Sequence, residues 1–185
     1  MMTPRFPRNL SIPVTNYLTG VTYSLHRVDE VVETDEILAE MVAIGNETLV
    51  YSWLFDEMLD GKPYQTKNAR DFFEMGINGW RSSKMFVFLL LTKDGHPAAC
   101  IDIKSADLGR AEIGYLASHR HRGVMTNTVV ALSELAKEAG YKMLYGRVRK
   151  RNRESLGVLL RAGFSRNEQE SAECETYDYF ELKFS

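Results

Sequence analysis

The chain has 185 residues, 44% of them hydrophobic and 26% charged, and a formal net charge of −2; this composition is typical of one folded domain, residues 1–185, with a sizeable core. The lack of a basic surplus argues against nucleic-acid binding, and no apolar run approaches the ~20 residues that a membrane-spanning helix needs. The two cysteines, Cys100 and Cys174, form no CxxC pair, so the sequence favours neither a metal site nor a disulfide framework.

The N-terminal part begins with a proline-containing segment. Residues 1–20 show little periodicity, which predicts an extended arm, and they lack the apolar core of a signal peptide, so a cytoplasmic protein is expected. Residues 21–28 predict a strand. Thr34 can cap a helix that continues to Ile44, because apolar residues recur there at helical spacing. Residues 46–66 are rich in aromatic side chains and give no clear assignment.

The middle of the chain contains the clearest hairpin. A second helix opens at Thr66 or Asn68 and extends through Trp80. Residues 85–107 predict two strands joined by a turn at an Asp-Gly pair, which is the strongest short-range hairpin signal. An Asp-Leu-Gly turn at 107–109 then leads into the next strand.

Residues 111–130 combine a strand, a basic loop and a helix. Side chains alternate over 111–117, and helical periodicity begins at Val124 and ends near Ala139, before Gly140. The first N–H groups of a helix lack intrahelical partners, and the helix dipole adds positive charge at the same end.

The loop between this strand and this helix has the features of an anion site. Gly123 allows the backbone to approach a phosphate closely. Arg120 and Arg122 add full positive charges suited to phosphate oxygens. The sequence therefore predicts a phosphate site at residues 118–126.

The remaining elements complete a mixed α/β domain. Residues 142–150 predict a strand, 152–164 a helix capped by Asn152, and 176–184 a last strand. The order β-α-α-β-β-β-α-β-α-β predicts a mainly antiparallel sheet with flanking helices and one right-handed crossover. An exposed last strand would allow a homodimer through edge pairing.

Two motifs resemble those of the GCN5-related N-acetyltransferases, the GNAT superfamily. Residues 120–125, RHRGVM, resemble its Q/R-x-x-G-x-G/A loop, and residues 152–164, NRESLGVLLRAGF, resemble its later N-x-x-[AS] helix ending in GF. The AEIGY strand and the NxxS motif look most like the branch with ribosomal-protein N-terminal acetyltransferases. Two departures are Met125 in place of Gly or Ala and a loop shorter by about two residues.

The resemblance, which covers residues 20–184, implies a three-layer GNAT domain with a sheet of about six or seven strands. It also implies acetyl-CoA as the donor and no metal; His119 and His121 are poorly spaced for a metal ion. The implied cofactor-binding residues are Tyr115, Leu116, Ala117, Arg120, His121, Arg122, Gly123, Val124, Met125, Thr126, Asn152, Ser155 and Leu159.

The implied chemistry is direct attack of a primary amine on the thioester in a ternary complex. A backbone N–H at Leu116 or Ala117 would bind the carbonyl oxygen. Leu159 stands where many members have a tyrosine acid, so the resemblance assigns the acid role to Ser155; an equal alternative is that this residue is small for close packing.

Glu112 matches the glutamate that serves as the base in some members. Its alternative is an ion-paired strand carboxylate, and Glu170, Glu173 or a water chain are rivals for the base. The acceptor suggested by the resemblance is a protein N-terminal α-amino group. A polyamine or an amino sugar, or a non-catalytic acyl-CoA-binding module, remain alternatives, and an acidic groove at Asp56, Glu57 and Asp60 would suit a cationic acceptor.

Overall fold

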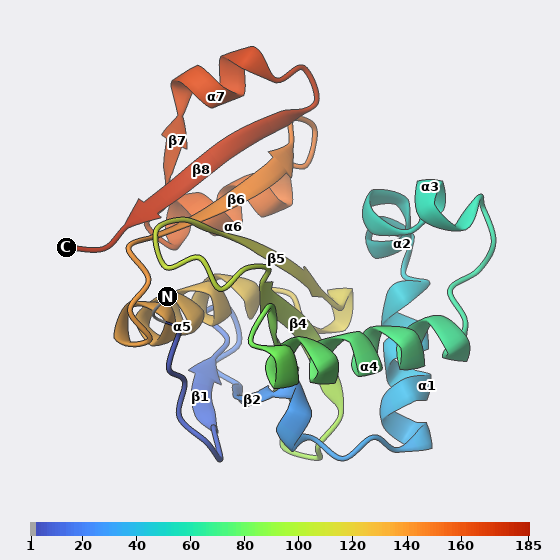
Figure 1. Cartoon of the computed structure of the whole chain (residues 1–185). Coiled ribbons are helices and arrows are strands. Elements are labelled where there is room, and N and C mark those ends of the chain that lie inside the picture. Colours follow the sequence, from blue (N-terminus) through green and yellow to red (C-terminus); the bar gives the residue numbers. More distant parts are fainter. Residues whose placement is uncertain (1–2) are drawn as a thin grey trace.

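A computed structural model describes residues 3–185 and shows one eight-stranded sheet with helices on both faces (Figure 1). The strands are β1 Ile12–Thr15, β2 Thr22–Arg27, β3 Phe86–Leu91, β4 Pro97–Ile103, β5 Ala111–Ala117, β6 Met143–Arg149, β7 Ser165–Asn167 and β8 Tyr177–Lys183. The α-helices are α1 Asp35–Gly45, α2 Thr48–Leu54, α3 Asp56–Leu59, α4 Thr66–Ser82, α5 Met125–Glu138, α6 Arg153–Arg161 and α7 Glu168–Glu173.

The strand order is β1-β2-β3-β4-β5-β6-β8-β7. All neighbours pair antiparallel except β5 and β6, which are parallel and joined through α5. This confirms the mixed α/β class and the mainly antiparallel sheet. The sheet exceeds the expected six or seven strands because the N-terminal arm contributes β1 and the segment after α6 contributes the three-residue β7.

Local signals account for most helix starts. Thr34 caps α1 by accepting a hydrogen bond from Ile37 N at 3.3 Å, as predicted. α4 begins at Thr66, one of the two predicted starts, with Gln65 as its N-cap; Asn68 lies inside the helix, where its side chain accepts from Gln65 N at 2.8 Å. The unassigned residues 46–66 contain α2 and α3, and α3 ends at Leu59, before Asp60 with its left-handed backbone.

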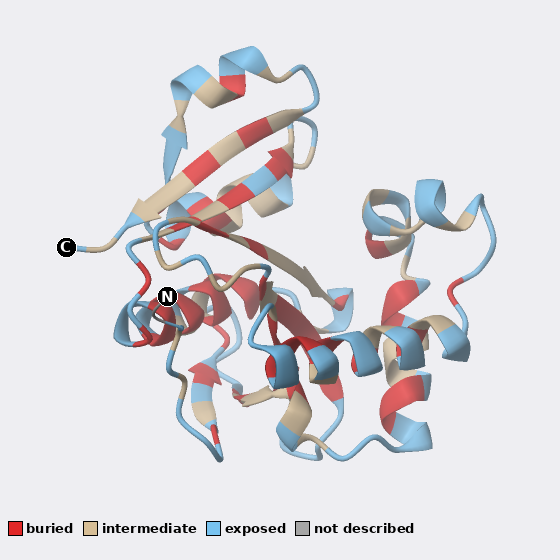
Figure 2. Cartoon of the chain, viewed as in Figure 1, coloured by how far each residue is buried: buried red, intermediate tan, exposed pale blue. Residues whose placement is uncertain are grey.

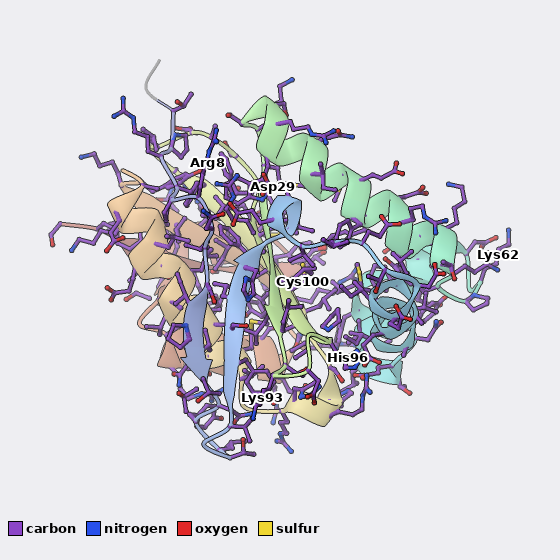
Figure 3. The ribbon with its side chains drawn as sticks, turned by 90° about the horizontal axis from the view of Figure 1, so that it is seen from below. Arg8, Asp29, Lys62, Lys93, His96 and Cys100 are labelled. Carbon is purple, nitrogen blue, oxygen red and sulfur yellow. The ribbon has the colours of Figure 1, made fainter. Side chains whose placement is uncertain are left out.

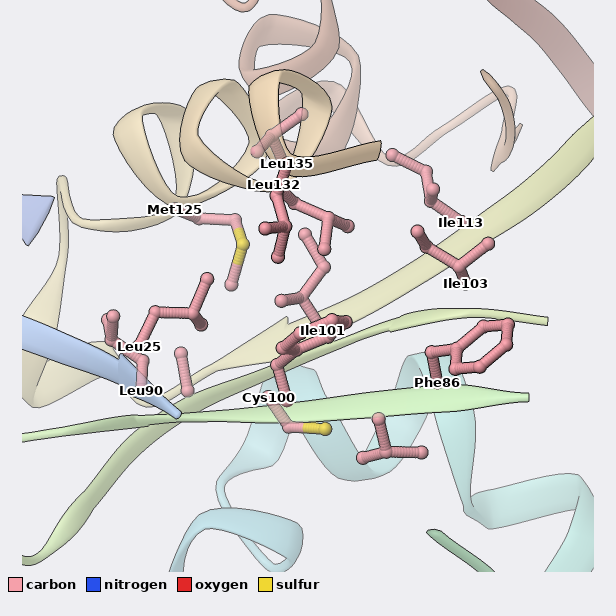
Figure 4. Packing of buried hydrophobic residues seen from close by; sticks show 14 of the residues in the cluster. Leu25, Phe86, Leu90, Cys100, Ile101, Ile103, Ile113, Met125, Leu132 and Leu135 are labelled. Carbon is pink, nitrogen blue, oxygen red and sulfur yellow. The ribbon is translucent and has the colours of Figure 1, made fainter. Parts of the chain in front are cut away.

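The core lies on both faces of the central strands. Ile101, Ile103 and Ile113 pack against Leu132 and Leu135 of α5, while Cys100 points to the opposite face (Figure 4). That opposite face is covered by α4 on β3 and by α1 on β4. β3 is fully apolar and β4 is apolar except for Asp102, and both strands are therefore largely buried on both sides.

The periphery is more exposed than the centre. Much of α2, α3 and α7 lies at the surface (Figure 2). The turn between β3 and β4 presents Lys93 and His96, while Cys100 lies inside the molecule (Figure 3). Across residues 3–185, the helices are all too short or too polar to cross a bilayer.

Candidate active site

A cleft opens where β5 and β6 separate. The two strands pair only at Ala111 with Leu144 and at Glu112 with Tyr145, and beyond this point they diverge (Figure 1). The space between them is a cleft of about 680 Å³, lined by β5, the loop after it, the start of α5, β6, α6 and α2. The splay leaves one edge of β5 without a neighbouring strand.

The hydrogen-bond pattern shows which groups of β5 face this cleft. Lys104 N donates to Glu112 O at 2.9 Å, and Ser118 N donates to Ala98 O at 3.0 Å. Because backbone groups alternate along an antiparallel pair, Leu116 also turns its N–H toward β4, while those of Tyr115 and Ala117 turn toward the cleft. The sequence offered the backbone N–H of Leu116 or of Ala117 as the donor to the thioester carbonyl oxygen. The geometry favours Ala117, because the N–H of Leu116 points away from the cleft.

The loop before α5 presents donors to the same cleft. Within residues 3–185, the backbone N–H groups of Gly123, Met125 and Thr126 have no hydrogen-bond acceptor. The helix dipole of α5 adds positive charge there, and Arg122 and Arg161 line the cleft beside these amides. This combination fits a pyrophosphate, because anions are bound at helix starts by such N–H groups.

The N-terminal hairpin holds this loop in place. Asn16, which is 1% exposed, donates from Nδ2 to Arg122 O at 2.9 Å. Asn127 Nδ2 donates to Thr15 O at 2.7 Å, and Tyr23 Oη lies 2.9 Å from His121 Nδ1. Burial, assisted by Arg120, lowers the pKa of His121 and favours its neutral imidazole.

Two of the predicted cofactor residues do not reach the cleft. Arg120 bonds to Glu40 and lies 3.7 Å from Glu47 Oε1, so its charge is used at α1 and α2. Val124 is fully buried, and its N–H donates to His121 O at 3.2 Å. The long-range partners of Arg120 explain why a basic loop residue turns away from the phosphate site.

The start of α6 forms the opposite wall. Asn152 caps the helix by accepting from Ser155 N at 3.1 Å, and the Tyr115 hydroxyl donates to Ser155 O at 3.1 Å. Burial raises the pKa of Tyr115 well above its usual value, so this tyrosine stays protonated. The Ser155 Oγ makes no hydrogen bond to any residue in 3–185, and Leu159 forms part of the cleft floor.

The carboxylate of Glu112 lies inside the cleft but is not isolated. Lys104 Nζ donates to it at 2.6 Å, Arg147 Nη2 at 3.1 Å and the Tyr145 hydroxyl at 3.3 Å. Burial alone would raise the pKa of Glu112, but the hydrogen bonds and charges of Lys104 and Arg147 outweigh it and lower the pKa. Glu112 is therefore ionised at neutral pH and weakly basic.

The rival carboxylates lie outside the cleft. Glu170 and Glu173 both belong to α7. Glu170 is paired with Arg110 at 2.5 Å, and Glu173 accepts a hydrogen bond from Gln169 Nε2 at 3.2 Å. Asp56 and Glu57 of the expected acidic groove do not line this cleft, but they line a second pocket of about 370 Å³ that shares Trp53, Leu54 and Arg149 with it.

Three cleft residues were not found by sequence reasoning: Tyr17, Lys104 and Arg161. Tyr17 comes from the distant N-terminal segment, and no local pattern places that segment at this cleft. In the described part of the chain, no three His, Cys, Asp or Glu side chains cluster in a way that could hold a metal ion.

Comparisons with known proteins agree with this geometry. A family model described as an acetyltransferase (GNAT) domain matches residues 29–165. A comparison with curated proteins finds no sequence match.

Three solved structures share the fold at low sequence identity. The GNAT domain of S. lividans PAT has a TM-score of 0.70 at 15% identity, covering 97% of this chain and 100% of its own. RimJ from Mycobacterium smegmatis, in complex with CoA-disulfide, gives 0.70 at 15% identity, with 94% and 86% covered. A proposed ribosomal-protein-serine acetyltransferase from Vibrio cholerae gives 0.69 at 16% identity, with 99% and 100% covered.

Proposed function

The chain belongs to the GNAT acetyltransferase family, and from this premise we propose that it transfers the acetyl group of acetyl-CoA to a protein N-terminal α-amino group. The observation that carries the proposal is the splay of β5 and β6, which places a free strand edge beside the unpartnered N–H groups at the start of α5. The likeness to the Vibrio cholerae structure supports the choice of acceptor.

The residues of the cleft fit acetyl-CoA. The N–H groups of Gly123, Met125 and Thr126 would hold the pyrophosphate, with Arg122 and Arg161 as charge partners. When bound, acetyl-CoA supplies an activated thioester to the cleft. The free edge of β5 at Tyr115 and Ala117 would hydrogen-bond the extended pantetheine arm.

Each catalytic role follows from where charge develops. The Ala117 N–H would stabilise the negative charge on the thioester carbonyl oxygen during attack. The Ser155 hydroxyl, which has no hydrogen-bond partner among residues 3–185, would donate a hydrogen bond to the leaving sulfur. We assign Glu112 as the group that receives the amine proton through water, because it is ionised and faces the cleft.

The acceptor test uses peptides that differ only in which amine is free. We expect acetylation of a peptide with a free N-terminal serine at least about tenfold faster than of an N-terminally blocked peptide with one lysine, since an α-amino pKa near 8 leaves more neutral amine than a lysine pKa near 10. Mass spectrometry of the products locates the acetyl group. Transfer only to a polyamine or an amino sugar would contradict the protein acceptor, and acetyl-CoA binding without transfer to any amine would indicate a non-catalytic module.

Glu112→Gln should reduce kcat/KM by about tenfold or more at pH 7, and the deficit should grow as the pH is lowered from 8.5 to 6.5. The lowered pKa keeps Glu112 ionised over this range, so the wild type retains its proton acceptor while the variant depends on amine that is already neutral. Rates are compared above pH 6.5 because burial raises the pKa of the neighbouring Asp102 to about 6.

Glu173→Gln, on α7 outside the cleft, is the matched control and should leave the pH profile unchanged. A Glu112→Gln deficit that is constant with pH would assign the residue to holding Lys104 and Arg147 instead.

A further inference from the structure

The acceptor side of the cleft carries excess positive charge. Gly146 and Val148 of β6 face α6, since a Cβ on Gly146 would lie 2.9 Å from Leu159 and Val148 is buried. Strand alternation therefore directs Arg147 and Arg149 to the opposite face, toward the side of the cleft lined by α2.

Compensation of this charge is incomplete. Lys104 and Arg147 share one carboxylate, that of Glu112. Within residues 3–185, the only carboxylate paired with Arg149 is that of Glu57, which is 3.4 Å away on a side chain that is 90% exposed. Such exposed pairs contribute little, because water screens them and the side chains lose entropy. The Glu57 contact nevertheless shows that an anion can reach this guanidinium.

The guanidinium groups of the two arginines lie near the same aromatic ring. Tyr177 of β8 is the register partner of Arg149, and the guanidinium carbons of Arg147 and Arg149 lie 5.4 and 5.8 Å from its ring centre. Their side chains are 41% and 38% exposed. Trp53 and Leu54 of α2 line the same cleft. The result is an accessible pair of guanidinium groups with limited conformational freedom.

We propose that this surface selects acceptors with an acidic side chain at the second or third residue, bound by Arg149 with help from Arg147; the proposal rests on the N-terminal acceptor proposed above. Arg147 contacts Glu112, where the amine is deprotonated, and Arg149 lies two residues further along β6. Two strand residues span about 7 Å, which matches two residues of an extended peptide. Arginine is also the side chain best suited to pair with a carboxylate through two parallel hydrogen bonds.

The test compares peptides that are identical except at residues two and three, with the starts Ser-Glu-Glu, Ser-Gln-Gln and Ser-Lys-Lys. For the wild type we expect a kcat/KM about tenfold higher for Ser-Glu-Glu than for Ser-Gln-Gln, mainly through KM, and a smaller ratio at high salt. Arg149→Gln should reduce the ratio to about threefold or less, and Arg149→Glu should shift the preference toward Ser-Lys-Lys. Fluorescence anisotropy of labelled peptides, measured with enzyme saturated with CoA, should show the same order of affinities.

Arg70→Gln is the matched control, because it also removes an exposed ion pair, with Glu33, but lies on α4 away from the cleft. Equal rates for the Glu-Glu and Gln-Gln peptides in the wild type would overturn this inference while leaving the proposed function intact. The inference would also be overturned if Arg149→Gln lowered kcat/KM by the same factor for the Glu-Glu and the Gln-Gln peptides. Failure to acetylate any of the peptides would overturn the proposed function itself, and this inference with it.

Discussion

Gly123→Ala should weaken acetyl-CoA binding by about 10- to 100-fold. Gly123 has a φ of +97°, and a Cβ there would lie 2.5 Å from Asn16 Oδ1 and 2.7 Å from Leu18 Cγ. The strain of a side chain at such a φ costs about 1–3 kcal/mol, and each 1.4 kcal/mol corresponds to a tenfold change in affinity. Asn16 is buried and holds the loop through Arg122 O, so relief of the clash requires the loop itself to move.

Calorimetric titration with acetyl-CoA measures this effect. Gly95→Ala is the control, because Gly95 has a similar φ of +83° but lies in the turn between β3 and β4 with nothing within 4 Å of a Cβ. It should lower the melting temperature and leave the affinity unchanged. If both variants bound acetyl-CoA like the wild type, the N–H groups around Gly123 would not be the phosphate site.

Ser155→Ala should lower kcat by about 10- to 100-fold while changing the Kd for acetyl-CoA by less than about threefold. The change removes a hydroxyl that has no other partner in the described structure, so the fold loses no hydrogen bond. The backbone contacts of this position, Asn152 Oδ1 with Ser155 N and Tyr115 Oη with Ser155 O, do not depend on the side chain. The expected loss therefore comes from the leaving sulfur, which would depart without a hydrogen-bond donor.

Single-turnover rates and calorimetry together separate the two effects. Ser165→Ala, on the exposed edge strand β7, is the control and should match the wild type in both. Equal losses in kcat and in acetyl-CoA affinity would instead mean that Ser155 acts by packing at the wall of the cleft.

The sequence by itself determined the features that depend on neighbouring residues. The caps at Thr34 and Asn152 were predicted because an N-cap is formed by a side chain and an amide three residues apart. The hairpin of β3 and β4 followed from alternation and an Asp-Gly turn. The start of α5 after Gly123 was also predicted from neighbouring residues. The N–H groups that lack intrahelical partners all belong to the first turn of the helix, so they lie in one short segment of the sequence.

The tertiary structure decided everything that depends on a distant partner. Arg120 was expected to bind a phosphate, but its guanidinium instead pairs with Glu40 and Glu47, because α1 and the start of α2 pack beside the loop. Only the pairing of β5 with β4 distinguishes the Ala117 N–H from that of Leu116. Tyr17 and Arg149 line the cleft although they are far apart in the chain, and contacts over such separations arise from how the elements pack, which no local pattern encodes.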